Sequence, residues 1–506
     1  MRSNYILFKT KNSNYYLYSF GKNQILLLNP ALYQLILMHK NGNDLNVWTK
    51  SLKSKTRLDD SIEYSKQEIM YQFNKFLFLF NNGYFEEFVI SKFNYTGDDI
   101  NYFISNTRQV TFEVTERCNL SCDYCVYGKF YTNRKSLDKN LSINSAKKTL
   151  EFLFERWSSS FNSSHDRKIS IGFYGGEPLL CYEFVVEIVN YVKKFPLFIQ
   201  NMIEFSMTTN GVVLDHYIPF LVENNFNLLI SLDGGTEFNN SYRTFKNRTS
   251  AYNIIISNIL NVKNAYPEYF EKYVRFNSVL HNRNSINEIT EFFRNKFNKV
   301  PSISELATDS INPECKDEFL NFFKRDEQIN KTQYKNEISD QEERVEIKFE
   351  RLVKFFGAYS GFSKENYLDL LINKKEKLYI PTATCRPFTR MVFITADGKI
   401  LPCERIGHEY VLGYVDDDKL HINYDEIANS INSRLDSIYD KYCNRCVFQF
   451  QCNTCVFHTN IGSEKFHCGE FKKYSESKME KMFADHISVL EEKPETYLKI
   501  TKYKLI

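Results

Sequence analysis

The sequence lacks long apolar runs, a signal peptide and a strong net charge. No stretch of its 506 residues approaches the roughly 18 consecutive apolar residues of a membrane helix, so a membrane is not an expected partner. The first residues contain too short an apolar run for a signal peptide, which predicts a cytoplasmic protein. The formal net charge is only +3 and no stretch is dense in Lys and Arg, so nucleic acid is not expected to bind.

Cysteine is the residue type whose placement is informative. The chain contains 12 cysteines, and in a long chain without a signal sequence clustered cysteines indicate bound metal in a reducing compartment, not disulfides. The length exceeds one ordinary hydrophobic core, so two to four domains are expected. With 43% apolar and 25% charged residues, the composition is typical of a globular protein.

Residues 1–92 are expected to form a small separate unit. Two short strand-like runs, Tyr15–Tyr18 and Gln24–Leu28, are followed by two helical patterns and a final short run, Tyr84–Val89. This order resembles the winged-helix-like precursor-recognition domain of enzymes that modify ribosomally made peptides. The resemblance implies that a leader peptide binds as an added strand beside the hairpin. The alternative is a structural cap on the catalytic domain.

Residues 108–310 alternate between strand-like and helix-like stretches. The six strand candidates are Val110–Val114, Lys168–Tyr174, Glu204–Thr208, Asn227–Leu232, Val274–Leu280 and Ser302–Leu306. Repeated strand-then-helix units predict an α/β fold with a parallel sheet. Six units suit a partial (β/α)6 barrel, whose chemistry lies at the carboxyl ends of the strands.

The rest of the chain divides by composition. Residues 311–380 are charged with helical spacing, and we expect them to form a helical bridge with little direct role in the chemistry. Residues 381–470 are rich in cysteine, and residues 471–506 form an amphipathic helix with a basic tail.

Cys118, Cys122 and Cys125 lie in one loop directly after the first strand candidate. Three thiolates this close can hold three irons of a cubane cluster and leave the fourth iron open to a small molecule. A zinc knuckle or three core cysteines is the alternative, but a zinc site needs a fourth ligand and the loop contains no histidine.

With Tyr124 just before its last cysteine, this loop resembles the cluster-binding motif of radical S-adenosylmethionine (SAM) enzymes. The resemblance implies a [4Fe-4S] cluster whose open iron chelates SAM, and an electron transfer that cleaves SAM to a 5′-deoxyadenosyl radical. In that family an aromatic residue in the position of Tyr124 lies beside the adenine.

Further SAM contacts are implied by the same resemblance. The tripeptide Gly175-Gly176-Glu177 matches a family loop whose carboxylate accepts hydrogen bonds from the SAM ammonium group. In the family's fourth-strand motif, the arginine that corresponds to Arg243 pairs with the SAM carboxylate, although a simple turn is an alternative for Asp233-Gly234-Gly235. The other implied contacts are Ser206, Thr208, Asn210, Ser231, Asp233 and Asn277.

Seven cysteines near the carboxyl end resemble the SPASM extension, which carries one or two auxiliary [4Fe-4S] clusters in peptide-modifying radical SAM enzymes. The resemblance implies one cluster on Cys443, Cys446, Cys452 and Cys468. A second cluster is implied on Cys385, Cys403 and Cys455, with an unidentified fourth ligand and an iron open to a substrate thiolate.

Two departures from the SPASM pattern are visible. The last close cysteine pair has two intervening residues where the family usually has three, and Cys385 is slightly further than usual from Gly398. A zinc ribbon is the alternative, but its two knuckles are normally separated by roughly 15 residues or more, and the gap here is shorter. Cys181 and Cys315 have no partners in sequence and are interpreted as a core thiol and a surface thiol.

The residues after Cys125, with Tyr127, Tyr131 and Arg134, resemble the ranthipeptide and sactipeptide maturases, which act on cysteine-rich peptides. The resemblance implies that the radical abstracts hydrogen from an acceptor residue and that a cysteine sulfur then bonds to its carbon. The implied partners are a precursor peptide and a reductant such as flavodoxin or ferredoxin.

Three other functions fit parts of the pattern. One is an enzyme that makes carbon–carbon crosslinks or epimerises residues, and another is a sulfatase-maturing type that generates formylglycine. The third is a non-enzymatic iron–sulfur electron carrier, which would not need glycine-acid and Asn-Gly loops at successive strand ends.

Overall fold

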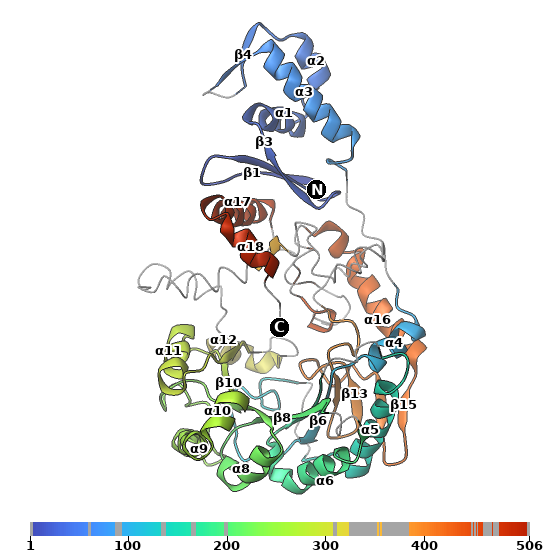
Figure 1. The fold of residues 1–506 in the computed structure, drawn as a ribbon, viewed down its shortest axis with the longest axis vertical. Coiled ribbons are helices and arrows are strands. Elements are labelled where there is room, and N and C mark those ends of the chain that lie inside the picture. The colour runs from blue at the N-terminus through green and yellow to red at the C-terminus, as the bar shows by residue number, and fades with distance from the viewer. Residues whose placement is uncertain are drawn as a thin grey trace.

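The computed structural model shows a large body built on one sheet, with a smaller N-terminal domain at one end (Figure 1). The described residues are 4–58, 62–86, 94–132, 138–162, 168–196, 201–306, 311–322, 352–353, 355–356, 384–446, 449, 452, 454–458, 468 and 475–502. Within these residues, no helix has both the length and the apolar character needed to cross a membrane.

Six neighbouring parallel strands form the first part of the large sheet. They are β6 (Gln109–Thr115), β7 (Ile169–Gly175), β8 (Ile203–Thr209), β9 (Asn227–Ser231), β10 (Val274–Val279) and β11 (Ser302–Ser304). They lie in chain order, and each pairs in parallel with the next. The predicted α/β class with a mostly parallel sheet is confirmed.

The two faces of these strands differ in polarity. Alternate residues such as Phe112, Phe205 and Phe276 are almost completely buried and pack against helices. The helices that follow the strands are α5 (Ile143–Trp157), α6 (Tyr182–Val192), α8 (Leu214–Glu223), α9 (Tyr252–Ala265), α10 (Pro267–Tyr273) and α11 (Ile286–Phe297). They line the outer side of the sheet in Figure 1. The opposite, inner face carries polar side chains, because successive residues of a strand point to opposite faces.

The cysteine-rich segment continues the same sheet. Strand β12 (Val392–Ile394) pairs in parallel with β6, and β13 (Lys399–Leu401), β14 (Gly413–Val415) and β15 (Leu420–Ile422) follow in antiparallel order. Helix α16 (Tyr424–Tyr439) packs against α4 (Gly97–Ser105). The C-terminal cysteines therefore begin beside the first strand of the parallel sheet.

The N-terminal domain is built on three antiparallel strands, β1 (Tyr5–Lys9), β2 (Tyr15–Ser19) and β3 (Gln24–Leu28). One face of this sheet packs on α1 (Pro30–Lys40) and α3 (Lys66–Asn81), and α2 (Leu45–Lys50) and the hairpin of β4 (Lys55–Arg57) and β5 (Glu63–Ser65) complete the domain. The expected hairpin and helices are present. Residues 84–86 form a turn where a strand was expected, and residues 87–89 lie outside the described residues.

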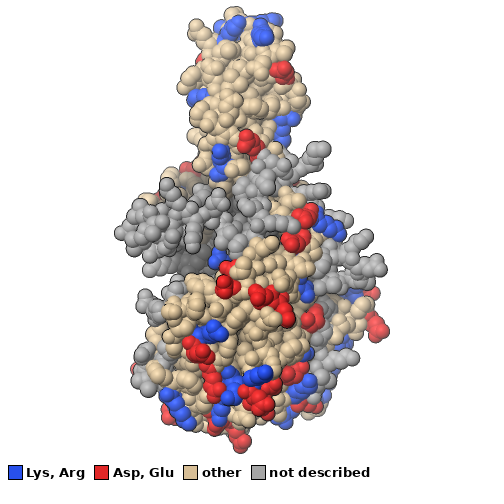
Figure 2. Space-filling model, turned by 90° about the vertical axis from the view of Figure 1, so that its right-hand side faces the viewer, with Lys and Arg blue, Asp and Glu red and all other residues tan. Residues whose placement is uncertain are grey.

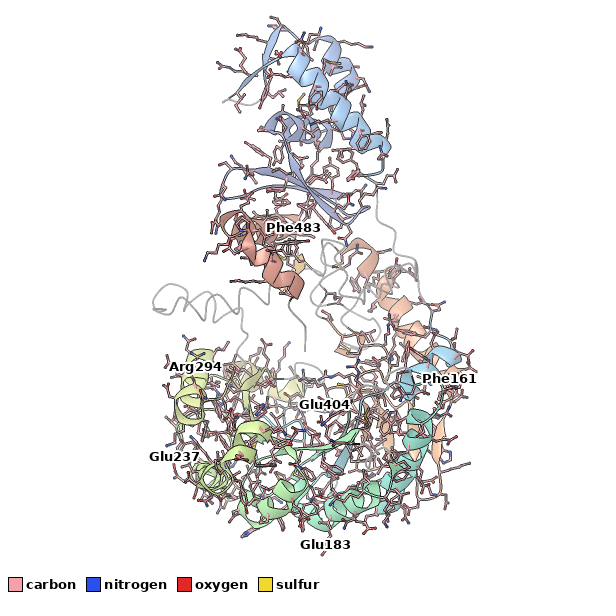
Figure 3. The ribbon with its side chains drawn as sticks, viewed as in Figure 1. Phe161, Glu183, Glu237, Arg294, Glu404 and Phe483 are labelled. Atoms are coloured by element: carbon pink, nitrogen blue, oxygen red, sulfur yellow. The ribbon has the colours of Figure 1, made fainter. Side chains whose placement is uncertain are left out.

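The other face of the N-terminal sheet is covered by the end of the chain. Helices α17 (Glu476–Glu492) and α18 (Glu495–Lys502) lie against it, and Phe483 of α17 contacts the rings of Phe8 and Tyr18 at centroid distances of 5.4 and 4.7 Å (Figure 3). We predicted residues 1–92 and 471–506 as separate units, but in the structure they share one hydrophobic core.

The surface of the large body carries both signs of charge. On the face shown in Figure 2, Lys and Arg side chains alternate with Asp and Glu side chains over the large body. This mixture agrees with the near-neutral net charge of the chain.

Candidate functional site

The cysteine loop is held by backbone hydrogen bonds to the segment that follows β9. The amides of Ser121 and Asp123 donate to the carbonyls of Thr244 and Tyr242 at 2.7 and 3.1 Å. These bonds fix the loop against the carboxyl end of the sheet. The loop therefore lies at the edge where the parallel strands of such folds present their functional side chains.

The three thiols of the loop are close enough to affect one another. Burial, with smaller contributions from Glu177 and Cys125, raises the pKa of Cys118 to about 11. Burial also raises the pKa of Cys122 well above its usual range, with added contributions from Cys125 and Cys118. Thiolates in such a site need a compensating cation, which iron supplies when it binds them. The donor set fits an iron–sulfur cluster.

No group of His, Cys, Asp or Glu within the described residues is arranged to hold a single metal ion. A cubane cluster does not require such an arrangement, because each thiolate binds a different iron. All twelve cysteines are present as thiols.

Gly175 and Gly176 lie against the backbone that leads into the cysteine loop. A Cβ on Gly175 would come within 2.3 Å of the Thr115 carbonyl oxygen, and one on Gly176 within 2.2 Å of the Arg117 oxygen. Gly175 also has a φ of +126°, which disfavours other residues. The resemblance to radical SAM enzymes implies that both glycines contact SAM. The close approach that the structure shows is to the chain itself, and their contact with SAM stays a prediction.

Glu177 is fully buried and joins two loops of the site. Its carboxylate accepts hydrogen bonds from the Asn210 amide at 2.7 Å, the Thr209 hydroxyl at 2.9 Å and the Leu179 amide at 3.2 Å. Burial raises the pKa of Glu177 to about 7, and the three hydrogen bonds offset only part of this effect. Asn210 in turn donates to Asn119 at 2.7 Å and to the Cys118 sulfur at 3.6 Å. Glu177 therefore acts on the cysteine loop through Asn210, and its predicted bond to SAM remains untested.

Asp233 and Arg243, both predicted to contact SAM, form a buried ion pair. The Arg243 Nε and Nη2 atoms donate to the Asp233 carboxylate at 3.0 and 3.3 Å. Burial alone would raise the pKa of Asp233, but the Arg243 guanidinium, together with His281 and the Tyr124 hydroxyl, outweighs it and lowers the pKa to about 2. The Tyr124 hydroxyl donates to the same carboxylate. Tyr124, which was predicted to lie beside the adenine, is therefore hydrogen-bonded to the motif that follows the fourth parallel strand, β9.

Four other predicted SAM contacts share the inner face of the sheet. Ser206 and Thr208 are two residues apart on β8, and Ser231 of β9 lies opposite Asn277 of β10 in the strand register. Because side chains opposite each other or two apart point to the same face, all four lie on the inner face, and each is half-buried. The predicted residues therefore form one polar surface beside the cysteine loop.

The sequence analysis did not identify two features of this site, the residue His281 and the segment 311–322. His281, fully buried after β10, lies 3.8 Å from the Asp233 carboxylate and stacks near the Tyr124 ring with centroids 5.9 Å apart. Its position at the carboxyl end of the fifth strand candidate was the available signal.

The second missed group is the segment 311–322, which we expected to have little direct role. It packs on the residues after Cys125: Phe319 of α12 (Lys316–Phe322) contacts the Phe130 and Tyr131 rings, and the Asn312 amide donates to the Phe130 carbonyl at 2.8 Å. This segment therefore supports the residues that follow Cys125, and its expected lack of a direct role in the chemistry stays a prediction. Arg134 and most of residues 323–380 lie outside the described residues.

Four of the C-terminal cysteines, Cys443, Cys446, Cys452 and Cys468, influence one another. Burial raises the pKa of Cys443 well above its usual range, with further contributions from Cys452, Cys446 and Cys468. The four cysteines predicted for one auxiliary cluster are therefore close enough to interact electrostatically.

Two cysteines of the second predicted set, Cys385 and Cys455, are connected through their neighbours in the chain. The Val456 amide donates to the Thr384 hydroxyl at 2.8 Å, which places Cys385 and Cys455 on adjoining segments. Cys403 is half-buried at the end of β13, and burial, together with the neighbouring Glu404, raises its pKa to about 12. The assignment of these three to one cluster stays a prediction. Cys181 and Cys315, interpreted as a core and a surface thiol, are both half-buried.

A mostly parallel α/β sheet with three thiols at the carboxyl end of its first strand defines a class of iron–sulfur enzymes. Comparison with known proteins gives the family: residues 112–295 match the Radical SAM superfamily. This part of the chain is a radical SAM domain, and the protein is a radical SAM enzyme whose cofactors are a [4Fe-4S] cluster and SAM.

Relatives and solved structures extend the similarity beyond that domain. The cysteine-type anaerobic sulfatase-maturating enzyme of Clostridium novyi (strain NT) is 25% identical over 392 residues, which cover 73% of this chain and 94% of the relative. The radical SAM cyclopropyl synthase TigE of Paramaledivibacter caminithermalis is 24% identical over 198 residues, 37% of this chain and 39% of that protein. The structure of native anSMEcpe with bound AdoMet and Kp18Cys peptide matches with a TM-score of 0.50 and 17% identity, over 76% of this chain and 99% of that chain.

The geometry assigns roles to the chain's own residues. The cluster would be held by Cys118, Cys122 and Cys125. A bound cluster and SAM together would supply a 5′-deoxyadenosyl radical that can abstract hydrogen. Glu177, through Asn210, fixes the position of the loop near Cys118. The inner polar face lies where it can orient a bound cofactor and substrate.

Proposed function

We propose that this radical SAM enzyme is a peptide maturase that forms thioether bonds between cysteine sulfurs and carbon atoms of a ribosomally made precursor. The observation that carries the proposal is the second group of cysteines, which lies in a segment that extends the radical SAM sheet next to its first strand. Three of them, Cys385, Cys403 and Cys455, leave one position of a four-iron cluster for another ligand. A substrate thiolate is a suitable ligand for that position. We place this activity in the cytoplasm.

A peptide substrate is also supported by comparison. The relative from Clostridium novyi is a sulfatase-maturating enzyme, and the structure of anSMEcpe contains a bound peptide. The same relative favours a second candidate function, the oxidation of a single cysteine to formylglycine. The two functions differ in the product, so one experiment separates them.

The experiment is anaerobic incubation with SAM, a reductant and the precursor peptide encoded beside the gene, followed by mass spectrometry and thiol alkylation. Thioether formation removes two hydrogens per crosslink and makes one thiol per crosslink resistant to alkylation. A carbon–carbon crosslink removes the same hydrogens but leaves every thiol reactive. Formylglycine formation removes the sulfur and creates an aldehyde, and an unmodified peptide contradicts all three.

The N-terminal domain is proposed to bind the precursor's leader. Strand β3 is at an edge of the three-stranded sheet, among the described residues, and Leu27 on it is 66% exposed. An edge strand presents unpaired backbone groups to which an extended peptide can add. An apolar side chain beside that edge can contact the peptide's own side chains.

Leu27→Glu tests this site without disturbing the core, because Leu27 is already exposed. We expect at least a tenfold loss of affinity for a fluorescent leader peptide, measured by anisotropy. The matched control is Val47→Glu, at a residue 63% exposed on α2 of the same domain, and it should bind normally. Equal affinities of the two variants would contradict leader binding at β3.

A further inference from the structure

Glu113 is a buried carboxylate that the proposed chemistry does not use. It lies on β6, one residue from the core residues Phe112 and Val114, and its side chain points to the inner face with no exposed area. A buried carboxylate is strongly unfavourable unless it receives hydrogen bonds. The partners of Glu113 therefore show what this residue does.

Three segments of the site meet at this side chain. The Ala396 amide, in the turn between β12 and β13, donates to one carboxylate oxygen at 2.8 Å. The hydroxyl of Tyr127, which lies two residues beyond Cys125 of the cysteine loop, donates to the other oxygen. The stem packs against Gly175, where an added Cβ would lie 3.3 Å from the Glu113 Cγ atom.

The turn that Glu113 holds leads directly to the auxiliary cysteines. It contains Ala396 and Gly398, whose φ is +79°, and the strand that follows it ends two residues before Cys403. The turn also has a surface contact, in which the Lys139 ammonium lies 3.4 Å from the Asp397 carboxylate. Both groups are partly exposed, so this contact contributes little to the position of the turn.

We propose that Glu113 is a positioning residue that fixes the auxiliary cysteine segment relative to the cysteine loop. One carboxylate receives a donor from each of them, so a movement of either segment breaks a bond in the buried interior. The parallel pairing of β12 with β6 ends at Ile394, and the bond to Ala396 continues the attachment beyond it. The separation of the cysteine sites is thus set by a side chain of the first strand.

The test uses hydrogen–deuterium exchange of the iron-loaded enzyme. Glu113→Ala should speed exchange at least tenfold in fragments that cover residues 126–131 and 392–401, while β8 and β9 stay protected. Glu113→Gln keeps an oxygen for the Ala396 amide and an NH₂ group for the Tyr127 oxygen, so it should stay within about threefold of the wild type. Tyr127→Phe should affect residues 126–131 alone, and Lys139→Gln should affect neither fragment by more than threefold.

SAM cleavage without peptide provides a second readout. Glu113→Ala should lower it at least fivefold at unchanged iron content, and Glu113→Gln should restore it to within twofold of the wild type. A uniform rise of exchange across the sheet would show a general stabilising role and overturn the proposal. Unchanged exchange at residues 392–401 in Glu113→Ala, or equal loss in the Gln and Ala variants, would also overturn it. If Glu113→Ala does not fold, the contrast between Tyr127→Phe and Lys139→Gln decides.

Discussion

The carboxylate of Asp233 and the guanidinium of Arg243 face each other in a buried bidentate contact, with N–O distances of 3.0 and 3.3 Å. The Asp233 side chain is completely buried and that of Arg243 is 7% exposed. The Val279 amide donates to the same carboxylate at 2.9 Å, and the Tyr124 hydroxyl also donates to it. The pair therefore connects the cysteine loop to two strands of the sheet.

Asp233→Ala leaves the Arg243 charge buried without its counter-ion. Removal of one partner of a buried pair costs about 3–5 kcal/mol, so we expect a loss of this size in the free energy of unfolding, measured with urea. The matched control is Arg248→Gln. Arg248 pairs with Asp123 of the same loop, but its side chain is 65% exposed, so the loss of unfolding free energy should be much smaller than in Asp233→Ala. Equal losses in the two variants would contradict the role of burial.

Glu177→Gln tests the connection between two strand-end loops. A glutamine has one oxygen, so it cannot accept from the amides of Leu179 and Asn210 as the two carboxylate oxygens do. The unsatisfied donor should cost about 1–3 kcal/mol of unfolding free energy. Because Asn210 contacts Cys118, the variant should also bind SAM more weakly in equilibrium dialysis. Unchanged stability and SAM affinity would show that the loop is held by other contacts.

Replacement of the cysteines should separate the two chemical sites. Alanine at Cys118, Cys122 and Cys125 should remove the iron of one cluster and abolish cleavage of SAM to 5′-deoxyadenosine. Alanine at Cys385 and Cys403 should spare at least a tenth of that cleavage but stop peptide modification. Cys181→Ala is the matched control and should change neither reaction. Equal loss of both reactions in both sets of variants would indicate that the auxiliary cysteines only support the fold.

The strands of the radical SAM domain could be predicted because each carries a local pattern. Apolar residues such as Phe112 and Phe205 alternate with polar ones, and turn residues mark where the strands end. The predicted contacts Ser206, Thr208, Ser231 and Asn277 share a face for the same reason, since alternation along a strand is a local property. The inner polar surface could therefore be predicted from the two-residue periodicity of the strands, which is visible in the sequence.

Contacts between distant parts of the chain left no such signal. Glu113 and Ala396 are 283 positions apart, and a glutamate in a strand-like run gives no sign of its buried partner.

The pairing of Asp233 with Arg243 was missed for another reason. Both residues matched a cofactor motif, and a motif does not show whether two charged groups neutralise each other.

The joining of the two chain ends, which the sequence did not predict, leads to a pH-dependent property. Glu491 of α17 accepts hydrogen bonds from Thr10, Asn12, Asn14 and Tyr16 of the β1–β2 hairpin, at 2.8–3.1 Å. Burial alone would raise the pKa of Glu491, but these hydrogen bonds lower it below its ordinary value. A carboxyl group whose pKa is lower in the folded than in the unfolded state stabilises the fold above its unfolded pKa. That stabilisation is lost as the pH falls through the folded pKa.

Glu491→Gln should therefore lower the stability of the protein at pH 7, and the difference from the wild type should shrink below about pH 4.5, near the ordinary pKa of a glutamate. Because the group is partly exposed, the difference at pH 7 should be about 1 kcal/mol. Urea unfolding monitored by tyrosine fluorescence at pH 7, 5 and 4 measures it. Asp485→Asn is the control, since Asp485 on the same helix lies 3.8 Å from the exposed Lys11 and should show almost no difference at any pH. A difference that stays constant down to pH 4 would mean that the Glu491 charge does not hold the chain ends together.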